Sequence, residues 1–305
     1  MPPYGQSVRS RPLLFTAPSE DAVSKIPHLV GKVALVVTSP PYHNSISYRS
    51  HQSDERADYR VREDGEYGGE YLELLGRVWR QCWELLRPGG HLAVNVGTVL
   101  FKGVHFPLSL DVQHQLRDSS DPWRFIRTIH WHKVTAGVRR AGGVIQHRLP
   151  GYWYPNIMSE HIILVRKPGR PVVANRDVPK DWWECVWDLA PVPPRTVEHP
   201  APFPEDLPHR LIRMLTKKGD QVLDPFNGAG ATTKAAFDLN RIGVGFDISS
   251  QYTAVAELRT DSGSSVRSSQ LRMVPIEPSS FEPKRRHEPA RQGTGRSARR
   301  RSTRG

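Results

Sequence analysis

Apolar positions in the first half of the chain follow two spacings, which predict strands and helices in turn. The β-branched run from Val33 to Val37 is typical of a strand buried on both faces. From Tyr71 to Leu86 apolar residues recur every three or four positions, which predicts an amphipathic helix that Pro88-Gly89-Gly90 ends. The same patterns predict a helix from Ser19 to about Leu29 and strands at Leu13–Phe15, His91–Gly97, Phe125–Trp131 and His161–Val165.

The second half has a more regular order of elements. An amphipathic helix begins near Leu207 and ends at Gly219. A strand, a glycine turn, a helix, a strand and a helix follow, which is the pattern of the cofactor half of a doubly wound α/β sheet. The segments are Gln221–Pro225, Ala231–Leu239, Ile242–Ile248 and Tyr252–Leu258, with the turn between the first two.

Composition sets the predicted domain limits. We expect one catalytic domain over residues 11–259, made of a first half (11–170) and a second half (197–259), with disordered ends at 1–10 and 260–305. Residues 43–69 are polar and predict a long surface loop, and residues 135–159 have no clear period. The formal charge is +12, of which +8 lies from Lys284 onward. The body is therefore only mildly basic, and the basic tail would attract polyanions without sequence preference.

Several classes are disfavoured by what the sequence lacks. It has two cysteines and no CxxC pair, which argues against a disulfide framework and against a metal site. It has no apolar run long enough for a membrane span and no apolar secretory segment at its start. We therefore expect a cytoplasmic protein that binds no metal and no membrane.

The glycine turn Asp224-Pro225-Phe226-Asn227-Gly228-Ala229-Gly230 lies between a strand and a helix. Glycines there let the backbone approach a ligand and leave helix N–H groups free to bind it. Asp247 follows about 20 residues later near the end of the next strand, where an acid can accept ribose hydroxyls. The pair predicts a nucleoside ligand, although a glycine turn can also mark only tight packing of strand and helix.

A second motif, Thr38-Ser39-Pro40-Pro41-Tyr42, directly follows the buried strand. In a doubly wound sheet this is the carboxyl edge, where ligands bind. Two prolines fix the backbone so that the Pro40 carbonyl can project into a site. Ser39 supplies a hydroxyl and Tyr42 a ring on which a base could stack. The alternative, an extended peptide ligand, fits a disordered tail better than this position.

Together these motifs resemble the catalytic and cofactor motifs of the amino-directed DNA methyltransferases. The catalytic motif comes first, as in their permuted β group, and the similarity covers roughly Leu13 to Leu258. The resemblance implies a mostly parallel seven-stranded sheet of the Rossmann-like S-adenosylmethionine methyltransferase type. It also implies that the segment with His199, Pro200 and Phe203 helps to hold the methionine end of the cofactor, and that Thr38 lies at the cofactor site. Two departures are Ala231, where Ser or Thr is usual, and Asp247 in place of Glu.

The resemblance implies a site-specific DNA methyltransferase acting on an exocyclic amine. Ser39 favours N4 of cytosine, because Asp or Asn is usual there in N6-adenine enzymes; the adenine activity is the alternative. In this hypothesis Ser39 Oγ and the Pro40 carbonyl accept the amine hydrogens while Tyr42 stacks on the base. Methylation of C5 would need a nucleophilic thiolate after a proline. Cys82 and Cys185 follow Gln81 and Glu184, and both are interpreted as packing residues.

The predicted partner is double-stranded DNA with the target base flipped out, and a cognate restriction endonuclease is a candidate second partner. Arginines and aromatic residues can contact guanine edges and phosphates or fill the space of a flipped base. Three tryptophans, Trp182, Trp183 and Trp187, are interpreted as core or lid packing. A non-catalytic nucleic-acid-binding protein and an RNA or protein-glutamine methyltransferase stay open, as does the choice between monomer and homodimer. The candidate DNA contacts are Tyr48, Arg139, Arg140, Arg148 and Trp153, with His147, Tyr152 and Tyr154 nearby.

Overall fold

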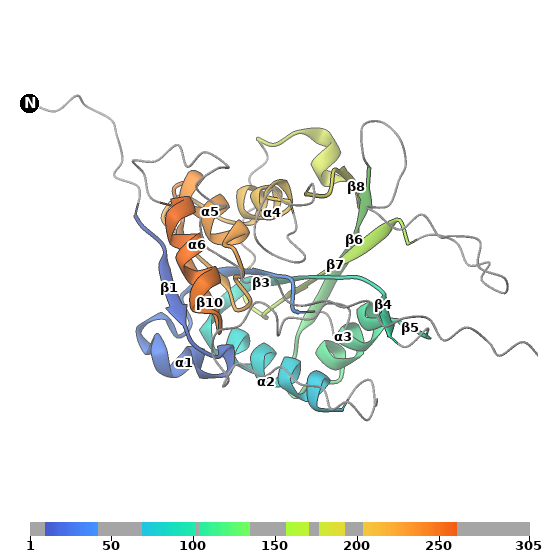
Figure 1. Cartoon of the computed structure of the whole chain (residues 1–305), viewed down its shortest axis with the longest axis horizontal. Helices are drawn as coiled ribbons and strands as arrows, with labels where there is room; N and C mark the ends of the chain where they lie inside the picture. The colour runs from blue at the N-terminus through green and yellow to red at the C-terminus, as the bar shows by residue number, and fades with distance from the viewer. Residues whose placement is uncertain are drawn as a thin grey trace, which may run out of the picture. The chain divides into compact units, whose positions relative to one another are not determined.

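One mixed sheet organises the described part of the chain. The computed structural model describes residues 10–41, 69–101, 104–134, 157–170, 177–192 and 204–260. Eight strands lie in the order β1-β10-β9-β2-β3-β7-β6-β8, and only β7 runs opposite to the rest (Figure 1). The strands are β1 (Leu13–Thr16), β2 (Val33–Thr38), β3 (Leu86–Val96), β6 (Arg124–Lys133), β7 (Ser159–Arg166), β8 (Val186–Leu189), β9 (Gln221–Asp224) and β10 (Ile242–Asp247).

Strand β2 lies at the centre of this sheet because its sequence suits burial on both faces. All six of its residues are buried, and it pairs in parallel with β9 on one side and β3 on the other. The predicted doubly wound, mostly parallel sheet is confirmed. It has eight strands among the described residues, whereas seven were predicted.

Helices cover both faces of the sheet (Figure 1). On one face α1 (Ala22–Lys25), α2 (Gly69–Leu85) and α3 (Leu108–Arg117) bury a first core. On the other face α4 (Asp206–Leu215) and α5 (Ala231–Asp238) bury a second core. Helix α6 (Ser250–Thr260) contacts α5, β1 and β10. Alternate residues of the central strands point into the two cores, as Val36 and Val37 of β2 do.

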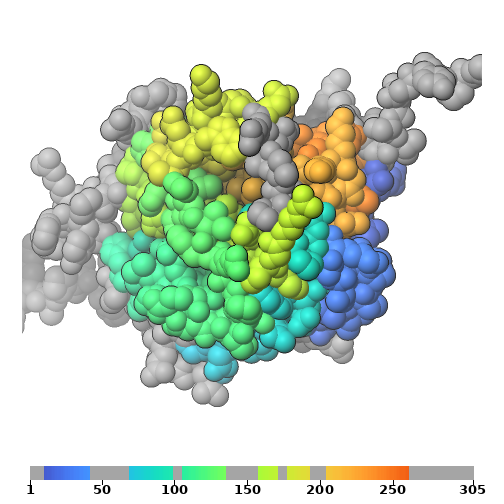
Figure 2. Space-filling model, turned by 180° about the vertical axis from the view of Figure 1, so that it is seen from behind, coloured from blue at the N-terminus to red at the C-terminus, as the bar shows by residue number. Residues whose placement is uncertain are grey.

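The second core contains the following sheet residues: Leu35 and Val37 from β2, Ala93 from β3, Ile129 and Trp131 from β6, Ile162 and Leu164 from β7, Trp187 and Leu189 from β8, and Val222 from β9. Viewed from behind in Figure 2, the yellow-green residues that include β7 lie beside the green segment that contains α3 and β6.

Some predicted elements were wrong. The helix predicted from Ser19 to about Leu29 is three short turns, with only Ala22–Lys25 α-helical. Pro27 interrupts it, because a proline disfavours the helical conformation of the residue before it, and Ile26 has φ −130° and ψ 53°. Helix α3, strand β8 and the short hairpin of β4 (Val99–Phe101) and β5 (Val104–Phe106) were not predicted.

The cysteine and tryptophan predictions divide between buried and exposed residues. Cys82 is fully buried in the first core, and burial raises its pKa, so it packs as predicted. Cys185 is exposed, so its interpretation as a packing residue was wrong: it lies outside the cores, directly before β8. Trp187 is fully buried in the second core and Trp182 packs against it, whereas Trp183 is half exposed.

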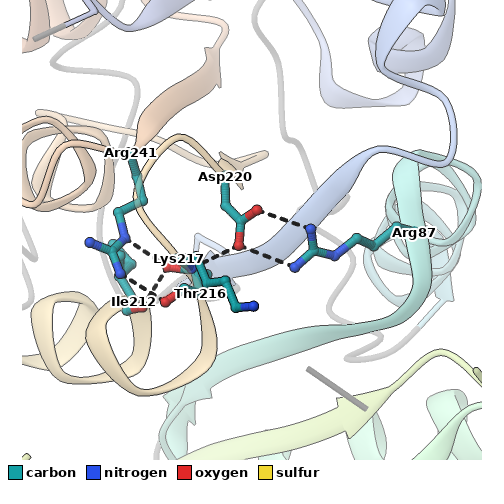
Figure 3. A network of polar contacts seen from close by, with 6 residues as sticks. All are labelled: Arg87, Ile212, Thr216, Lys217, Asp220 and Arg241. Atoms are coloured by element: carbon teal, nitrogen blue, oxygen red, sulfur yellow. Dashed lines mark hydrogen bonds and ion pairs between the residues drawn. The ribbon is translucent and has the colours of Figure 1, made fainter. Parts of the chain in front are cut away.

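A polar network ties the two halves of the chain together at the amino edge of the sheet (Figure 3). Arg87, near the start of β3, donates two hydrogen bonds of 3.0 and 3.1 Å to the carboxylate of Asp220, the residue before β9. The Lys217 backbone N–H donates to the same carboxylate at 2.8 Å. On the same turn Arg241 donates to the backbone carbonyl of Thr216 at 2.8 Å. The bidentate pairing of Arg87 with Asp220 links the two halves of the chain at the edge of the sheet opposite to the candidate site.

None of the described helices combines the length and the apolar character that crossing a membrane requires.

Candidate active site

The predicted catalytic motif and the predicted cofactor motif meet at the carboxyl edge of the sheet. Strands β2 and β9 are parallel neighbours, so Thr38 and Asp224 end them side by side. The Thr38 hydroxyl donates a 2.7 Å hydrogen bond to Oδ1 of Asp224. Two motifs that lie far apart in the sequence are therefore in direct contact, and Ser39 is the next residue along.

Asp224 is the most deeply buried acid of the site, with no exposed surface. Its Oδ1 also accepts the backbone N–H of Phe226 at 3.0 Å, while Oδ2 has no hydrogen-bond partner among the described residues. Burial raises the pKa of Asp224 to about 6, although the Thr38 hydrogen bond acts in the opposite direction. One oxygen therefore holds the turn in place, and the carboxyl group also lies beside the Thr232 hydroxyl, which lowers its pKa as Thr38 does.

The glycine turn needs glycine for two physical reasons. Gly228 and Gly230 have φ values of 48° and 82°, in the left-handed region that favours glycine. A Cβ on Gly230 would lie only 2.6 Å from Cβ of Ala256, so α5 and α6 could not pack as they do. The turn is held against β10 by a 2.8 Å bond from the Asn227 N–H to the Phe246 carbonyl.

Asp247 ends β10, next to the turn, and is partly exposed. Its two oxygens accept the N–H groups of Gly228 at 2.9 Å and Ser249 at 2.8 Å. Burial raises its pKa to about 6, and the two backbone hydrogen bonds oppose that shift. A carboxylate has about four acceptor positions, so two are left for the hydroxyls of a ribose. The partial exposure of Asp247 and the close backbone of the turn fit a nucleoside such as that of S-adenosylmethionine.

Two aromatic residues and a serine shape the rest of the turn. Phe226 packs partly against the first core, with its ring 6.5 Å from that of Trp79 in an edge-on arrangement. The buried Ser19 donates to the Pro225 carbonyl. The Pro225-Phe226 segment is therefore anchored twice, through the Pro225 carbonyl and through the Phe226 ring.

The catalytic motif is held by a residue that the sequence did not identify as functional. Pro40 is buried, and Ser39 and Pro41 are partly exposed. Tyr71, at the start of α2, is buried and donates a 2.8 Å hydrogen bond from its hydroxyl to the Pro41 carbonyl. The apolar stripe predicted the burial of Tyr71, but no sequence signal indicated its hydroxyl contact.

Side chains from three further strands continue the site beyond Ser39. Asn95 of β3 donates a 2.6 Å hydrogen bond from Nδ2 to Glu160 of β7, and Lys133 of β6 is ion-paired with the same carboxylate. We call Ser39, Asn95, Glu160 and Lys133 the polar row. The sequence analysis missed its last three members, because Asn95 lies inside one predicted strand, while Glu160 and Lys133 lie just outside two others.

Part of the predicted site falls outside the described residues. This holds for the last motif residue, Tyr42, and for the proposed methionine-end segment. It also holds for residues 43–68 of the predicted loop, for residues 135–156 of the segment without a clear period, and for the basic tail from residue 261 onward. The residues concerned are Tyr42, Tyr48, Arg139, Arg140, His147, Arg148, Tyr152, Trp153, Tyr154, His199, Pro200 and Phe203.

Comparison with known proteins agrees with this geometry. Residues 33–258 match a family model described as DNA methylase. The type II methyltransferase M.MjaI of Methanocaldococcus jannaschii is 28% identical over 261 residues, covering 74% of this chain and 84% of the relative. M.HpaI of Haemophilus parainfluenzae is 25% identical over 247 residues, covering 75% of this chain and 68% of the relative.

Solved structures share the fold. TTHA0409 of Thermus thermophilus, provisionally assigned as a DNA modification methylase, is 30% identical with a TM-score of 0.60, covering 84% of this chain and 97% of that one. Its S-adenosylmethionine complex matches with a TM-score of 0.59. The cytosine-N4-specific PvuII DNA methyltransferase has a TM-score of 0.65 at 19% identity, covering 86% of this chain and 90% of that one, which shows a common fold.

Proposed function

Because the chain belongs to the N6/N4 family of DNA methylases, we propose that it methylates N4 of cytosine within a specific sequence of double-stranded DNA. The broader activity, S-adenosylmethionine-dependent DNA methylation at an exocyclic amine, is that of the family. The finer assignment to cytosine rests on Ser39, since Asp or Asn is usual at this position in adenine enzymes. Methylation of N6 of adenine is the alternative.

The observation that carries the proposal is the hydrogen bond between Thr38 and Asp224, 2.7 Å long. It joins the last residue of the catalytic strand to the first residue of the cofactor turn. A methyl donor held by the turn and a base held by Ser39 would therefore be neighbours. Such proximity would account for much of the catalysis in this group transfer, and the methylated amine would then lose one proton to solvent.

The cofactor would be held mainly by the second half of the chain. Asp247 would accept the ribose hydroxyls, and the turn from Asp224 to Gly230 would approach the rest of the nucleoside with its backbone. The segment containing His199, Pro200 and Phe203 is the proposed holder of the methionine end. When bound, S-adenosylmethionine supplies a methyl group on a positively charged sulfur.

The catalytic motif would prepare the amine for attack. An exocyclic amine is a weak nucleophile because its lone pair is delocalised into the ring. Ser39 Oγ and the Pro40 carbonyl would accept hydrogen bonds from the two N–H groups of the amine. These bonds would turn the nitrogen lone pair out of the ring plane, while Tyr42 would stack on the base. The base must leave the duplex to reach this edge of the sheet. These roles need no metal ion.

The names of the relatives support a proposal about the biological setting. M.MjaI, M.HpaI and M.BglII are named type II methyltransferases, and M.BamHII is named an orphan methyltransferase. A cognate restriction endonuclease is therefore part of the proposal. Tyr48, Arg139, Arg140, Arg148 and Trp153 remain the predicted DNA contacts.

The decisive experiment is to incubate the purified protein with labelled S-adenosylmethionine and mixed-sequence duplex DNA, and then to identify the labelled nucleoside. N4-methylcytosine is expected. N6-methyladenine would overturn the cytosine assignment and leave the family activity intact. Absence of any methylated nucleoside, with cofactor binding measured separately, would favour RNA, a protein or non-catalytic binding.

The substitution Ser39→Ala tests the catalytic motif in the same assay. Turnover should fall at least about tenfold, because one acceptor for the amine is lost, while cofactor affinity stays within about twofold. Ser109→Ala is the matched control, since Ser109 is a buried serine on α3. Unchanged turnover of Ser39→Ala would remove this hydroxyl from the mechanism.

A further inference from the structure

Asn95 and Ser39 lie next to each other across two neighbouring strands. Strands β2 and β3 are parallel, and their register pairs Val37 with Ala93. Ser39 and Asn95 each follow two residues later on the same face of the sheet, because both paired residues point into the second core. Ser39 precedes Pro40, which favours the extended conformation that continues β2. Neighbouring strands are about 4.8 Å apart, so a serine hydroxyl and an asparagine amide placed in this way can reach each other.

The amide of Asn95 is held in one orientation by Glu160. Glu160 lies two residues before Ile162, the residue opposite Asn95 on β7, so the contact runs diagonally between the two strands. Asn95 Nδ2 donates a 2.6 Å hydrogen bond to Oε2 of Glu160, while Oε1 is ion-paired with Lys133. A carboxylate only accepts hydrogen bonds, so the amide must present Nδ2 to Glu160, which leaves Oδ1 for another partner.

The remaining oxygen of this amide, Oδ1, is an unpaired buried acceptor. Asn95 is 1% exposed, and Oδ1 has no hydrogen-bond partner among the described residues. A buried acceptor without a donor costs free energy, and a leucine would fill the same position without that cost. Such a group in a protein calls for an explanation. The explanation that fits this position is a donor that reaches Oδ1 when the site is working.

The hydroxyl of Ser39 is the donor that the strand register places closest to this oxygen. A hydroxyl carries one hydrogen and two lone pairs. In the proposed function Ser39 Oγ accepts a hydrogen bond from the amine of the base, and it can do so only if its own hydrogen points elsewhere. A hydrogen bond to Oδ1 of Asn95 would direct that hydrogen away from the amine and leave the lone pairs facing the base.

We infer that Asn95 is a positioning residue whose Oδ1 accepts the hydroxyl hydrogen of Ser39, so that Ser39 Oγ acts only as an acceptor toward the target amine. Glu160 acts through Asn95, because it determines which end of the amide faces Ser39. The inference rests on the proposed function in its broader form, methylation of an exocyclic amine at Ser39. It holds for cytosine and for adenine, since both amines donate hydrogen bonds.

The test is a double-mutant cycle of Asn95→Leu and Ser39→Ala, measured as single-turnover methylation of duplex DNA with saturating labelled S-adenosylmethionine. Asn95→Leu keeps a similar volume and removes the acceptor, so the rate should fall about tenfold. In the Ser39→Ala background the same substitution should slow the reaction by no more than about twofold, because the hydroxyl through which Asn95 acts is already absent. Cofactor affinity should stay within about twofold in all variants.

A second cycle uses Glu160→Gln, which changes fewer atoms and keeps Asn95. The new amide can donate to Oδ1 of Asn95 and so compete with Ser39, so the rate should fall about threefold to fivefold. This loss should also disappear in the Ser39→Ala background. The second cycle decides the question if Asn95→Leu proves too unstable to purify, and thermal unfolding of each variant identifies that case.

Gln115→Leu is the matched control. Gln115 lies on α3, outside the candidate site, and its amide also bonds a neighbouring side chain, accepting from Trp79 at 2.8 Å. Its loss should lower the thermal stability. Any effect of Gln115→Leu on the rate should be the same with and without the hydroxyl of Ser39, as expected for a residue that acts only on the fold.

The outcomes separate this inference from the proposed function. If the effects of Asn95→Leu and Ser39→Ala multiply, to about a hundredfold in the double variant, or if Asn95→Leu leaves the rate unchanged, Asn95 does not act through Ser39. The methylated nucleoside formed by the wild type would still support the proposed function in either case. An unchanged rate for Ser39→Ala alone would instead remove the hydroxyl from the proposed mechanism, and the inference would fail with it.

Discussion

The two ends of the carboxyl edge differ in which groups form the candidate site, backbone at one end and side chains at the other. Over β9 and β10 the site is mostly backbone: N–H groups hold Asp224 and Asp247, and a glycine turn lies between them. Over β3, β7 and β6 the site consists of side chains that bond to one another. A backbone-built site changes little with sequence and suits an invariant ligand. A side-chain-built site can be altered by single substitutions and therefore suits a ligand that must be discriminated.

The largest effect is expected from a substitution in the glycine turn, at the end of the site that is formed by backbone. In Gly230→Ala the new Cβ would meet Ala256 at 2.6 Å while the backbone stays at φ 82°. We expect the free energy of unfolding to fall by about 3 kcal/mol, with loss of cofactor binding. Chemical denaturation and calorimetric titration with S-adenosylmethionine measure the two effects.

Gly219→Ala is the matched control, because Gly219 also has φ 82° but nothing lies within 4 Å of its Cβ position. It should cost only the conformational strain, about 1 kcal/mol, and leave cofactor affinity unchanged. Equal destabilisation in both variants would show that strain alone, and not the contact between α5 and α6, makes glycine necessary at position 230.

A smaller and reversible effect at the same end of the site is expected from pH, through the protonation of Asp224 and Asp247. Burial raises the pKa values of Asp224 and Asp247 to about 6, above their ordinary value of 3.8. As the pH falls from 7 to 5, the loss of the Asp247 charge should weaken S-adenosylmethionine binding about tenfold. The sign for folding is opposite. The folded protein binds more protons than the unfolded chain between about pH 4 and 6, so these two groups stabilise it as the pH falls through that range.

Titrations at several pH values, with thermal unfolding at the same values, check this prediction. In Asp247→Asn the cofactor affinity should be low and should lose much of its pH dependence. Asp220→Asn is the control, because Asp220 also accepts a backbone N–H but lies at the amino edge. Cofactor affinity that is equal at pH 5 and pH 7 in the wild type would contradict an ionised Asp247 in binding.

The smallest effect is expected from Tyr71→Phe, because Tyr71 contacts the motif that lies between the two ends of the site. Tyr71→Phe removes the hydroxyl that donates a 2.8 Å hydrogen bond to the Pro41 carbonyl. We expect a loss of about 1 kcal/mol in the free energy of unfolding and a few-fold lower turnover, with unchanged cofactor affinity. Steady-state kinetics and calorimetry separate these quantities. A change in cofactor affinity with no change in turnover would show that Tyr71 serves the cofactor and not the catalytic motif.

The same contrast explains what the sequence could predict. The cofactor end lies within one continuous stretch from Asp224 to Asp247. A glycine turn followed by an acid about 20 residues later can be recognised directly in the sequence. The catalytic motif is equally compact. Asn95, Glu160 and Lys133 belong to three strands, and only the registers of β3, β7 and β6 place them together. Their identity as a cluster therefore depends on tertiary structure.

The misassigned elements have local causes. Helix α3 carries only Leu108, Val112 and Leu116 on its buried stripe, with Ser109, and follows a proline, so its signal is short. Strand β8 is four residues long with an alternating burial pattern, and the tryptophans before it obscured that alternation. Cys185 was interpreted by residue type, whereas its position before an edge strand leaves it exposed.

Strand β1 has consequences for how the chain is made. Among the described residues its strand partner is β10, with Leu13 beside Val244, and the Thr16 hydroxyl bonds to Thr253 of α6. During synthesis β1 leaves the ribosome early and must wait for nearly the whole sheet before it can pair. Pairing over such a sequence separation is slow, and an unpaired strand is prone to aggregation until then. The folding of this protein should therefore be limited by the late synthesis of β10. The glycine turn and Asp247, which are proposed to bind the nucleoside, should be the last part of the molecule to form.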